Sequence, residues 1–93
     1  MRIITENKNE DYYVCPVCGY EKLSEKPYNT YGNPSYEICP CCGFEFGFDD
    51  QSRKITYEEY RNQWIEKGMK WFDSSEKPEN WDYKKQLENI GIE

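Results

Sequence analysis

The chain has 93 residues and a formal net charge of −6, and 32% of its residues are charged, 37% hydrophobic and 17% aromatic. This length allows a single domain (1–93) with a small core, because such a chain buries only about 60–65% of its unfolded surface. A small polar domain usually needs additional stabilisation, for example from a bound metal. The negative net charge of the chain repels phosphate backbones, so a nucleic-acid partner is not expected.

Residues 1–11 carry five charged side chains and no apolar run, so we expect an N-terminal tail and no signal peptide. No stretch of the chain approaches the roughly 18 apolar residues of a membrane span. These features predict a cytoplasmic protein that does not contact a membrane.

Two short stretches of the chain share one pattern. The first, Val14-Cys15-Pro16-Val17-Cys18-Gly19-Tyr20-Glu21, returns twenty-four positions later as Ile38-Cys39-Pro40-Cys41-Cys42-Gly43-Phe44-Glu45. We name residues 14–21 the first knuckle and residues 38–45 the second knuckle. Together they read C-x2-C-x20-C-x2-C, at the upper end of the usual spacing of zinc sites.

Two thiolates three positions apart can hold one ion only if the chain between them turns tightly. Pro16 and Pro40 fix φ near the value at which such a turn starts. Gly19 and Gly43 supply the positive φ that closes it. The knuckles are therefore built for metal binding.

We expect the metal ligands to be Cys15, Cys18, Cys39 and Cys42. Four thiolates at about 2.3 Å leave no open coordination position, which is typical of a structural zinc site. Cys41 is the spare thiol, because its use in place of Cys42 would give a C-x-C turn. A disulfide framework is disfavoured, since the cysteines number five and paired C-x2-C turns suit a metal better.

The residues around the knuckles predict four short strands, at 12–15, 20–23, 35–39 and 43–48, with a loop at 24–34. In the last strand Phe44, Phe46 and Phe48 alternate with polar residues, so all three rings should lie on one buried face. Asp49 and Asp50 should then form a solvated turn. The loop tyrosines Tyr28 and Tyr31 are candidates either for packing or for contact with a partner.

A helix is predicted over 55–68, where Thr56 and Glu59 form a capping box. An apolar stripe of Tyr57, Tyr60, Trp64 and Ile65 should dock on the three phenylalanines, with Arg61 among the residues on the polar side. The fold class is therefore α+β: a small antiparallel zinc ribbon (12–50), similar to the two-knuckle arrangement of rubredoxins, with one or two C-terminal helices (55–91) packed on it.

The segment 69–72 holds three large apolar residues that should be tucked against the body or else form a protein-binding patch. A second helix should start near Pro78 and end at Gly91, with Tyr83, Leu87 and Ile90 on one side. The spacing leaves open whether Trp81 faces the core or solvent.

The second knuckle, together with the residues that precede it, resembles the small bacterial CPCC-type cysteine-rich proteins. The motif is Ser35-Tyr36-Glu37-Ile38-Cys39-Pro40-Cys41-Cys42-Gly43-Phe44. Later residues extend the resemblance over nearly the whole chain: Tyr57-Glu58-Glu59-Tyr60, Trp64, Gly68, Trp71-Phe72, Pro78, Trp81 and Gln86-Leu87. The resemblance implies a zinc ribbon without an established activity, and an association with bacterial toxin systems. In the common form of that family the doubled thiol lies in the first knuckle, whereas here it lies in the second.

Three classes of function follow. The first is a protein-interaction module scaffolded by zinc, with the tyrosine loop or Trp71-Phe72 as its contact surface. The second is an iron electron carrier, because residues 13–20 are similar to the first knuckle of rubredoxins and four thiolates also hold iron. The third and least favoured is a nucleic-acid-binding ribbon. An enzyme is not expected, since a four-thiolate site leaves no place for an activated water and the chain has no histidine.

Overall fold

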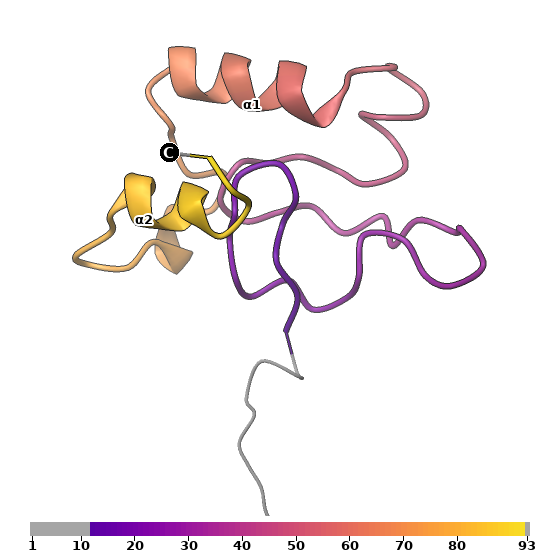
Figure 1. Ribbon diagram of the computed structural model, residues 1–93, viewed down its shortest axis with the longest axis horizontal. Helices are drawn as coiled ribbons and strands as arrows, with labels where there is room; N and C mark the ends of the chain where they lie inside the picture. Colours follow the sequence, from indigo (N-terminus) through magenta and orange to yellow (C-terminus); the bar gives the residue numbers. More distant parts are fainter. Residues whose placement is uncertain (1–11, 93) are drawn as a thin grey trace, which may run out of the picture.

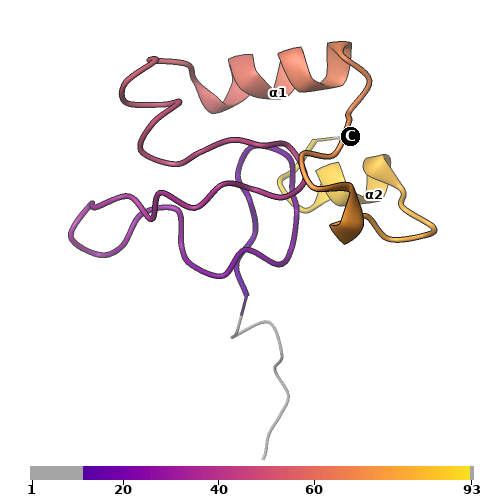
Figure 2. The ribbon, with the colours of Figure 1, turned by 180° about the vertical axis from the view of Figure 1, so that it is seen from behind.

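Helices are confined to the C-terminal half of the chain in the computed structural model, which describes residues 12–92. They are α1 (Tyr57–Glu66), η2 (Ser74–Glu76, a 3-10 turn) and α2 (Tyr83–Glu88). Figure 1 shows α1 lying across the looped segment that carries the knuckles, with α2 beside the same segment. The view from behind gives the same arrangement (Figure 2). The predicted tail at 1–11 lies outside the described residues.

The predicted antiparallel ribbon is largely absent from the described residues. Its four strands are replaced by three isolated bridges, which pair Tyr13 with Leu23, Tyr28 with Pro34 and Ile38 with Glu45. One bridge closes each knuckle, and backbone hydrogen bonds such as Cys15 to Tyr20 and Tyr36 to Phe46 extend the pairing only slightly. The antiparallel ribbon of the α+β prediction is therefore not confirmed in the described residues, and the cysteine-bearing region consists of two linked turns.

Pairing of the strand predicted at 43–48 stops at Phe46, whose backbone still bonds to Tyr36 and Glu37. The carboxylate of Asp49 accepts a hydrogen bond from the Glu45 N–H (2.8 Å), and that of Asp50 accepts one from the Gly47 N–H (2.7 Å). Such local side-chain bonds stabilise a coiled backbone in place of a continued strand. The chain coils over 46–52 instead, so Phe44 and Phe46 are fully buried whereas Phe48 is 45% exposed.

The Asp49-Asp50 pair is also not the solvated turn that the sequence suggested. The Asp49 side chain is 7% exposed and forms an ion pair with Arg53 at 2.9 Å. Asp50 accepts a hydrogen bond from the Tyr28 hydroxyl, which holds the tyrosine loop against this turn. Both carboxylates therefore stabilise the backbone around the second knuckle.

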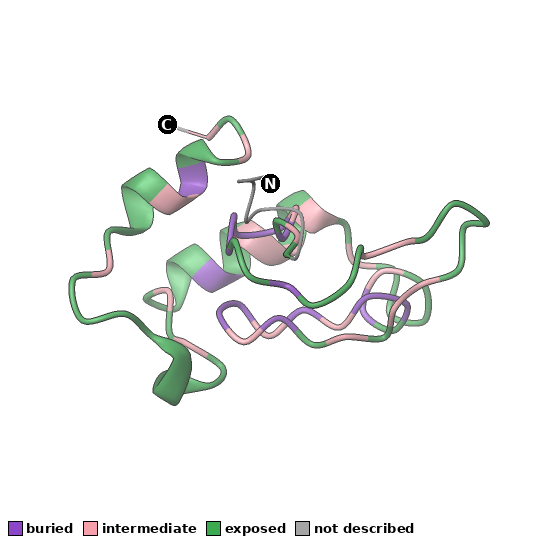
Figure 3. Cartoon of the chain, turned by 90° about the horizontal axis from the view of Figure 1, so that it is seen from below, coloured by how far each residue is buried: buried purple, intermediate pink, exposed green. Residues whose placement is uncertain are grey.

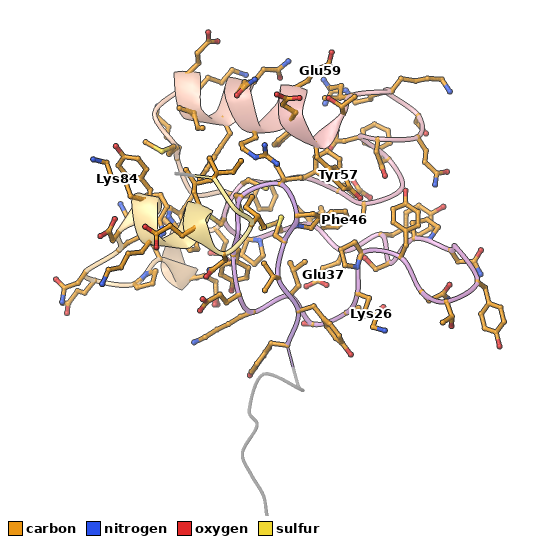
Figure 4. All side chains as sticks on the ribbon, viewed as in Figure 1. Lys26, Glu37, Phe46, Tyr57, Glu59 and Lys84 are labelled. Atoms are coloured by element: carbon orange, nitrogen blue, oxygen red, sulfur yellow. The ribbon has the colours of Figure 1, made fainter. Side chains whose placement is uncertain are left out.

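Helix α1 begins and docks as its sequence pattern predicts. Thr56 is the N-cap, and its capping box with Glu59 is formed in both directions at 3.0 Å. Tyr57 and Tyr60 meet Phe44 edge to face, with ring centroids 5.4 and 5.0 Å apart. Figure 4 shows Tyr57 pointing from α1 toward Phe46, while Glu59 points away.

The apolar stripe of α1 is narrower than predicted. Trp64 is buried, but Ile65 is 36% exposed. Most buried residues lie in the loops below the helix rather than on the helices themselves (Figure 3). The core is thus formed by the knuckles and their aromatic neighbours, with the helices as a cover.

The second helix starts five residues later than predicted. Pro78 lies in an exposed loop, and α2 begins at Tyr83 because the Asp82 carboxylate caps it by accepting from the N–H groups of Lys84 and Lys85. Leu87 is buried, as the spacing indicated. The two aromatic residues of the 69–72 segment differ in exposure, because Trp71 is partly buried whereas Phe72 is 64% exposed.

Candidate metal centre

The four predicted ligand cysteines meet at one buried point between the two knuckles. The sulfur atoms of Cys15, Cys18, Cys39 and Cys42 all lie within 4.8 Å of one another. Across the knuckles, Cys15 Sγ is 3.9 Å from Cys42 Sγ, and Cys18 Sγ is 3.7 Å from Cys39 Sγ. Metal–sulfur bonds of about 2.3 Å in a tetrahedron place the sulfurs about 3.8 Å apart. These residues therefore fit a tetrahedral four-thiolate metal ion.

The sulfurs are too far apart to be joined as disulfides, and all five cysteines of the chain are buried free thiols. A disulfide requires sulfurs about 2.05 Å apart. The cysteines that form the cluster are at most 6% exposed. A metal held here would have four protein ligands and little contact with water.

The two knuckles share one backbone hydrogen-bonding pattern. In the first, the N–H of Gly19 donates to the carbonyl of Cys15 at 2.8 Å, and in the second, Gly43 donates to Cys39 at the same distance. The predicted positive φ is confirmed at both glycines, with values of 88° and 83°. Each turn therefore presents its two sulfurs toward the other turn in the same way.

Electrostatics of the thiols favour a bound cation. Burial, followed by the neighbouring Cys15, raises the pKa of Cys42 well above its ordinary value. Burial also opposes charge on Cys39, but hydrogen bonds from Cys15, Cys18 and Cys42 outweigh it and lower the pKa of Cys39. The cluster alone thus favours the thiolate of Cys39 and disfavours that of Cys42. A divalent cation is what allows four thiolates to lie this close together.

The carbonyls of the first knuckle are bound by side chains from both helices. Arg61 on α1 donates from Nε to the carbonyl of Val17 (2.7 Å) and from a terminal nitrogen to that of Pro16 (3.1 Å). Gln86 Nε2 on α2 donates to the carbonyl of Cys18, and Asn89 Nδ2, just after α2, donates to that of Gly19, both at 3.0 Å. Four consecutive carbonyls of this turn are therefore held by residues far away in sequence.

The second knuckle is held in a similar way by α1 and by the segment that follows it. The Tyr60 hydroxyl donates to the carbonyl of Cys42 at 3.0 Å. The backbone N–H groups of Phe72 and Asp73 donate to the carbonyls of Cys41 and Pro40 at 3.0 and 2.8 Å. The C-terminal half of the chain thus fixes both turns, as outer residues commonly do around metal ligands.

Sequence reasoning missed these supporting residues. It placed Arg61 on the polar side of the helix, although Arg61 lies four positions after Tyr57 and so shares its face. Gln86 and Asn89 have no comparable signal, because their partners lie 68 and 70 positions earlier in the chain. Only the folded structure brings them together.

The spare thiol Cys41 is fully buried beside the cluster and belongs to no ligand set in the structure. Gln86 Nε2, which donates to the carbonyl of Cys18, also lies 3.3 Å from Cys41 Sγ. Cys41 therefore packs under α2 and contributes to its attachment.

Three basic side chains gather beside the second knuckle. Arg53, Lys67 and Lys70 line a cavity of about 280 Å³ that reaches Cys42, and none of the residues lining it is acidic. A divalent ion with four thiolates carries a charge of about −2. Arg53 is already paired with Asp49, so Lys67 and Lys70 are the cations that offset that charge.

Among residues 12–92, no helix combines the length and the apolar character that a membrane crossing requires. In comparisons with models of protein families, with curated proteins and with solved structures, the chain finds no match.

Proposed function

We propose that this chain is a small protein-interaction module whose fold is held by a structural zinc ion. The observation that carries the proposal is the buried cluster of four sulfurs with tetrahedral spacing. Four thiolates complete the coordination of zinc and leave no position for a substrate or an activated water. The chain also has no histidine to act as a base. Both features favour a scaffold over an enzyme.

Exposed aromatic side chains mark the surface that we expect to contact a partner. Tyr31 is 85% exposed in the turn closed by the backbone hydrogen bond between Asn29 and Asn33. The loop at 24–34, which contains this turn, projects from the body (Figure 1). Phe72 is 64% exposed beside the second knuckle. Aromatic residues are enriched at protein interfaces. Tyr28 is a weaker candidate than the sequence suggested, because its hydroxyl hydrogen-bonds to Asp50 and Gln51.

Two measurements test the proposal. Metal analysis of natively expressed protein should give one zinc per chain. Affinity capture should then recover a protein partner that is lost with Tyr31→Ser or Phe72→Ser and retained with Glu58→Gln, a control on the exposed side of α1. Capture of no partner, together with turnover of a small substrate by the zinc-loaded protein, would overturn it.

Iron is the alternative occupant, and it would make the chain an electron carrier. Four thiolates accept iron as well as zinc, and the N–H of Val17 lies 3.4 Å from Cys15 Sγ, as a donor to a metal-bound sulfur would. An iron protein would be red and reversibly reducible. A colourless native protein that contains zinc excludes this alternative.

A further inference from the structure

A second pocket lies on the other side of the first knuckle, between the turn at 20–22 and α2. Its volume is about 310 Å³, at the small end of the range for ligand sites. Its aromatic lining comes from Tyr20, Trp71 and Trp81. Tyr20 is 7% exposed, whereas both tryptophans are only partly buried, so the indoles form the accessible walls.

The Trp71 ring stands nearly at right angles to both of the other rings. Trp71 meets Tyr20 at 83° with centroids 5.7 Å apart, and it meets Trp81 at 80° with centroids 5.4 Å apart. Where perpendicular aromatic walls border one pocket, a cation can contact more than one ring, as in sites that recognise quaternary ammonium groups. The two indole rings offer no hydrogen-bond acceptor, so against them a cation without N–H donors loses least on leaving water.

One wall of the pocket already holds a cation of the chain itself. The ammonium nitrogen of Lys77 lies 5.5 Å from the centroid of the Trp81 ring. This distance is within the range of a cation–π contact. Trp81 therefore accepts a positive charge. Lys77 does not line the pocket, but its charge on the same ring should weaken the attraction of that ring for a second cation.

Charge around the pocket favours a positive ligand. Three carboxylates line it against two lysines: Glu21, Glu76 and Asp82 against Lys22 and Lys85. Asp82 caps α2 and Glu21 accepts from Asn89, which leaves Glu76 free to face a ligand. The negative charge of the whole chain acts in the same direction.

Trp71 is a costly choice of residue for packing alone. Its Nε1–H is buried and has no hydrogen-bond partner among the described residues. A buried donor without a partner costs roughly 1–3 kcal/mol, and phenylalanine would pack here without it. What tryptophan adds over phenylalanine is the stronger attraction of its ring for cations.

We propose that the pocket of Tyr20, Trp71 and Trp81 binds an alkylated ammonium group. The ring faces bind the cation and the Glu76 carboxylate supplies the opposite charge. The group can belong to a free quaternary amine or to a methylated lysine of another protein. This proposal does not depend on the proposed function, because the pocket contains no metal ligand and no member of the Tyr31 and Phe72 contact surface.

The test compares choline with 3,3-dimethylbutan-1-ol, its uncharged isostere, on the zinc-loaded full chain. Binding is followed by the shifts of the tryptophan indole resonances in NMR spectra. We expect saturable shifts of Trp71 and Trp81 with choline, and binding of the alcohol at least about tenfold weaker. Equal binding of the two compounds, or no saturable shift within the solubility of choline chloride, would overturn the proposal.

Variants test the role of each group. Trp71→Phe keeps an aromatic ring and should weaken choline binding about threefold to tenfold, and Glu76→Gln should weaken it by about half as much on the same scale. Lys77→Gln removes the cation on the Trp81 ring and should tighten binding about twofold to fivefold. Lys26→Gln makes the same charge change away from α2 (Figure 4) and should leave binding unchanged. Equal effects of Lys77→Gln and Lys26→Gln would contradict the weakening by Lys77.

The source of the cation is decided by a peptide that contains trimethyl-lysine. If this peptide shifts the same two indole resonances at a lower concentration than choline does, the ligand is a modified protein. If choline binds more tightly, the ligand is a small quaternary amine.

Discussion

Replacement of Gly19 by alanine is the sharpest test of how α2 is attached to the first knuckle. A Cβ at Gly19 would lie 2.1 Å from the backbone carbonyl oxygen of Gln86. Gly32 provides a matched control, because its φ of 82° is close to the 88° of Gly19 but its Cβ would meet nothing within 4 Å. The two alanine variants therefore share the backbone strain and differ only in the clash.

The expected size of each effect follows from these contacts. An alanine held in the left-handed region costs about 1–2 kcal/mol, so Gly32→Ala should lower the free energy of unfolding by about that amount. In Gly19→Ala the Gln86 carbonyl must also retreat by more than about 1 Å to restore ordinary contact. That movement breaks the hydrogen bonds from Gln86 and Asn89 to the knuckle, each worth about 0.5–1.5 kcal/mol. The total for Gly19→Ala is about 2–5 kcal/mol.

The assay is urea unfolding of the zinc-loaded variants, followed by tryptophan fluorescence, with zinc release to a chromogenic chelator as a second readout. Gly43→Ala should fall between the other two, because its Cβ would lie 3.2 Å from the movable Phe72 side chain. Equal destabilisation by Gly19→Ala and Gly32→Ala would refute the reasoning, since it would mean that α2 does not press on the first knuckle.

Three further predictions concern the metal and the tyrosines. Cys42→Ser should lose the bound metal whereas Cys41→Ser keeps one ion per chain, as metal analysis of the purified variants would show. A strong chelator should unfold the knuckles, because metal binding and folding are linked. The near-ultraviolet circular dichroism signal of tertiary structure should then be lost and should return when zinc is added. A native spectrum in the presence of the chelator would contradict this. Burial raises the pKa of Tyr20, Tyr57 and Tyr60 to about 12. Between pH 10 and pH 12 the folded chain therefore binds more protons than the unfolded one, so the free energy of unfolding should fall as pH rises through this range. Tyrosinate absorbance should show these three groups titrating near pH 12. Unchanged stability from pH 10 to pH 12 would count against this prediction.

The predictions that agree with the structure depend on patterns of residues close together in the sequence. The duplicated C-x2-C turns predicted which four sulfurs come together, because each turn is short and its glycine selects one backbone conformation. The capping box of Thr56 and Glu59 was also predicted correctly, and α1 (Tyr57–Glu66) lies within the predicted range 55–68. Within each knuckle and within the cap the interacting groups lie a few residues apart, so a local pattern is sufficient, and the repetition of one knuckle pattern predicts that the two knuckles share a site.

The strand prediction at 43–48 failed beyond Phe46, where local bonds coil the chain. Alternation of Phe44, Phe46 and Phe48 suggested one buried face, but Asp49 and Asp50 bind the N–H groups of Glu45 and Gly47 and hold a coil there. Phe48 is therefore exposed. Periodicity alone does not reveal whether the polar residues that follow will stabilise a coil in place of a longer strand.

The sequence by itself determined the sulfur ligand pattern, the two turns that present it and the helix that covers it. Only the tertiary structure decided that Arg61, Gln86 and Asn89 bind the carbonyls of the first knuckle, and that Trp71 and Trp81 stand at right angles beside Tyr20. The physical reason is that the three contacts of Arg61, Gln86 and Asn89 join residues 44 to 70 positions apart in the chain, and that the Trp71 ring also meets Tyr20 of the first knuckle. Which groups these side chains contact depends on how the helices pack against the two knuckles. Local spacing in the sequence does not predict that packing.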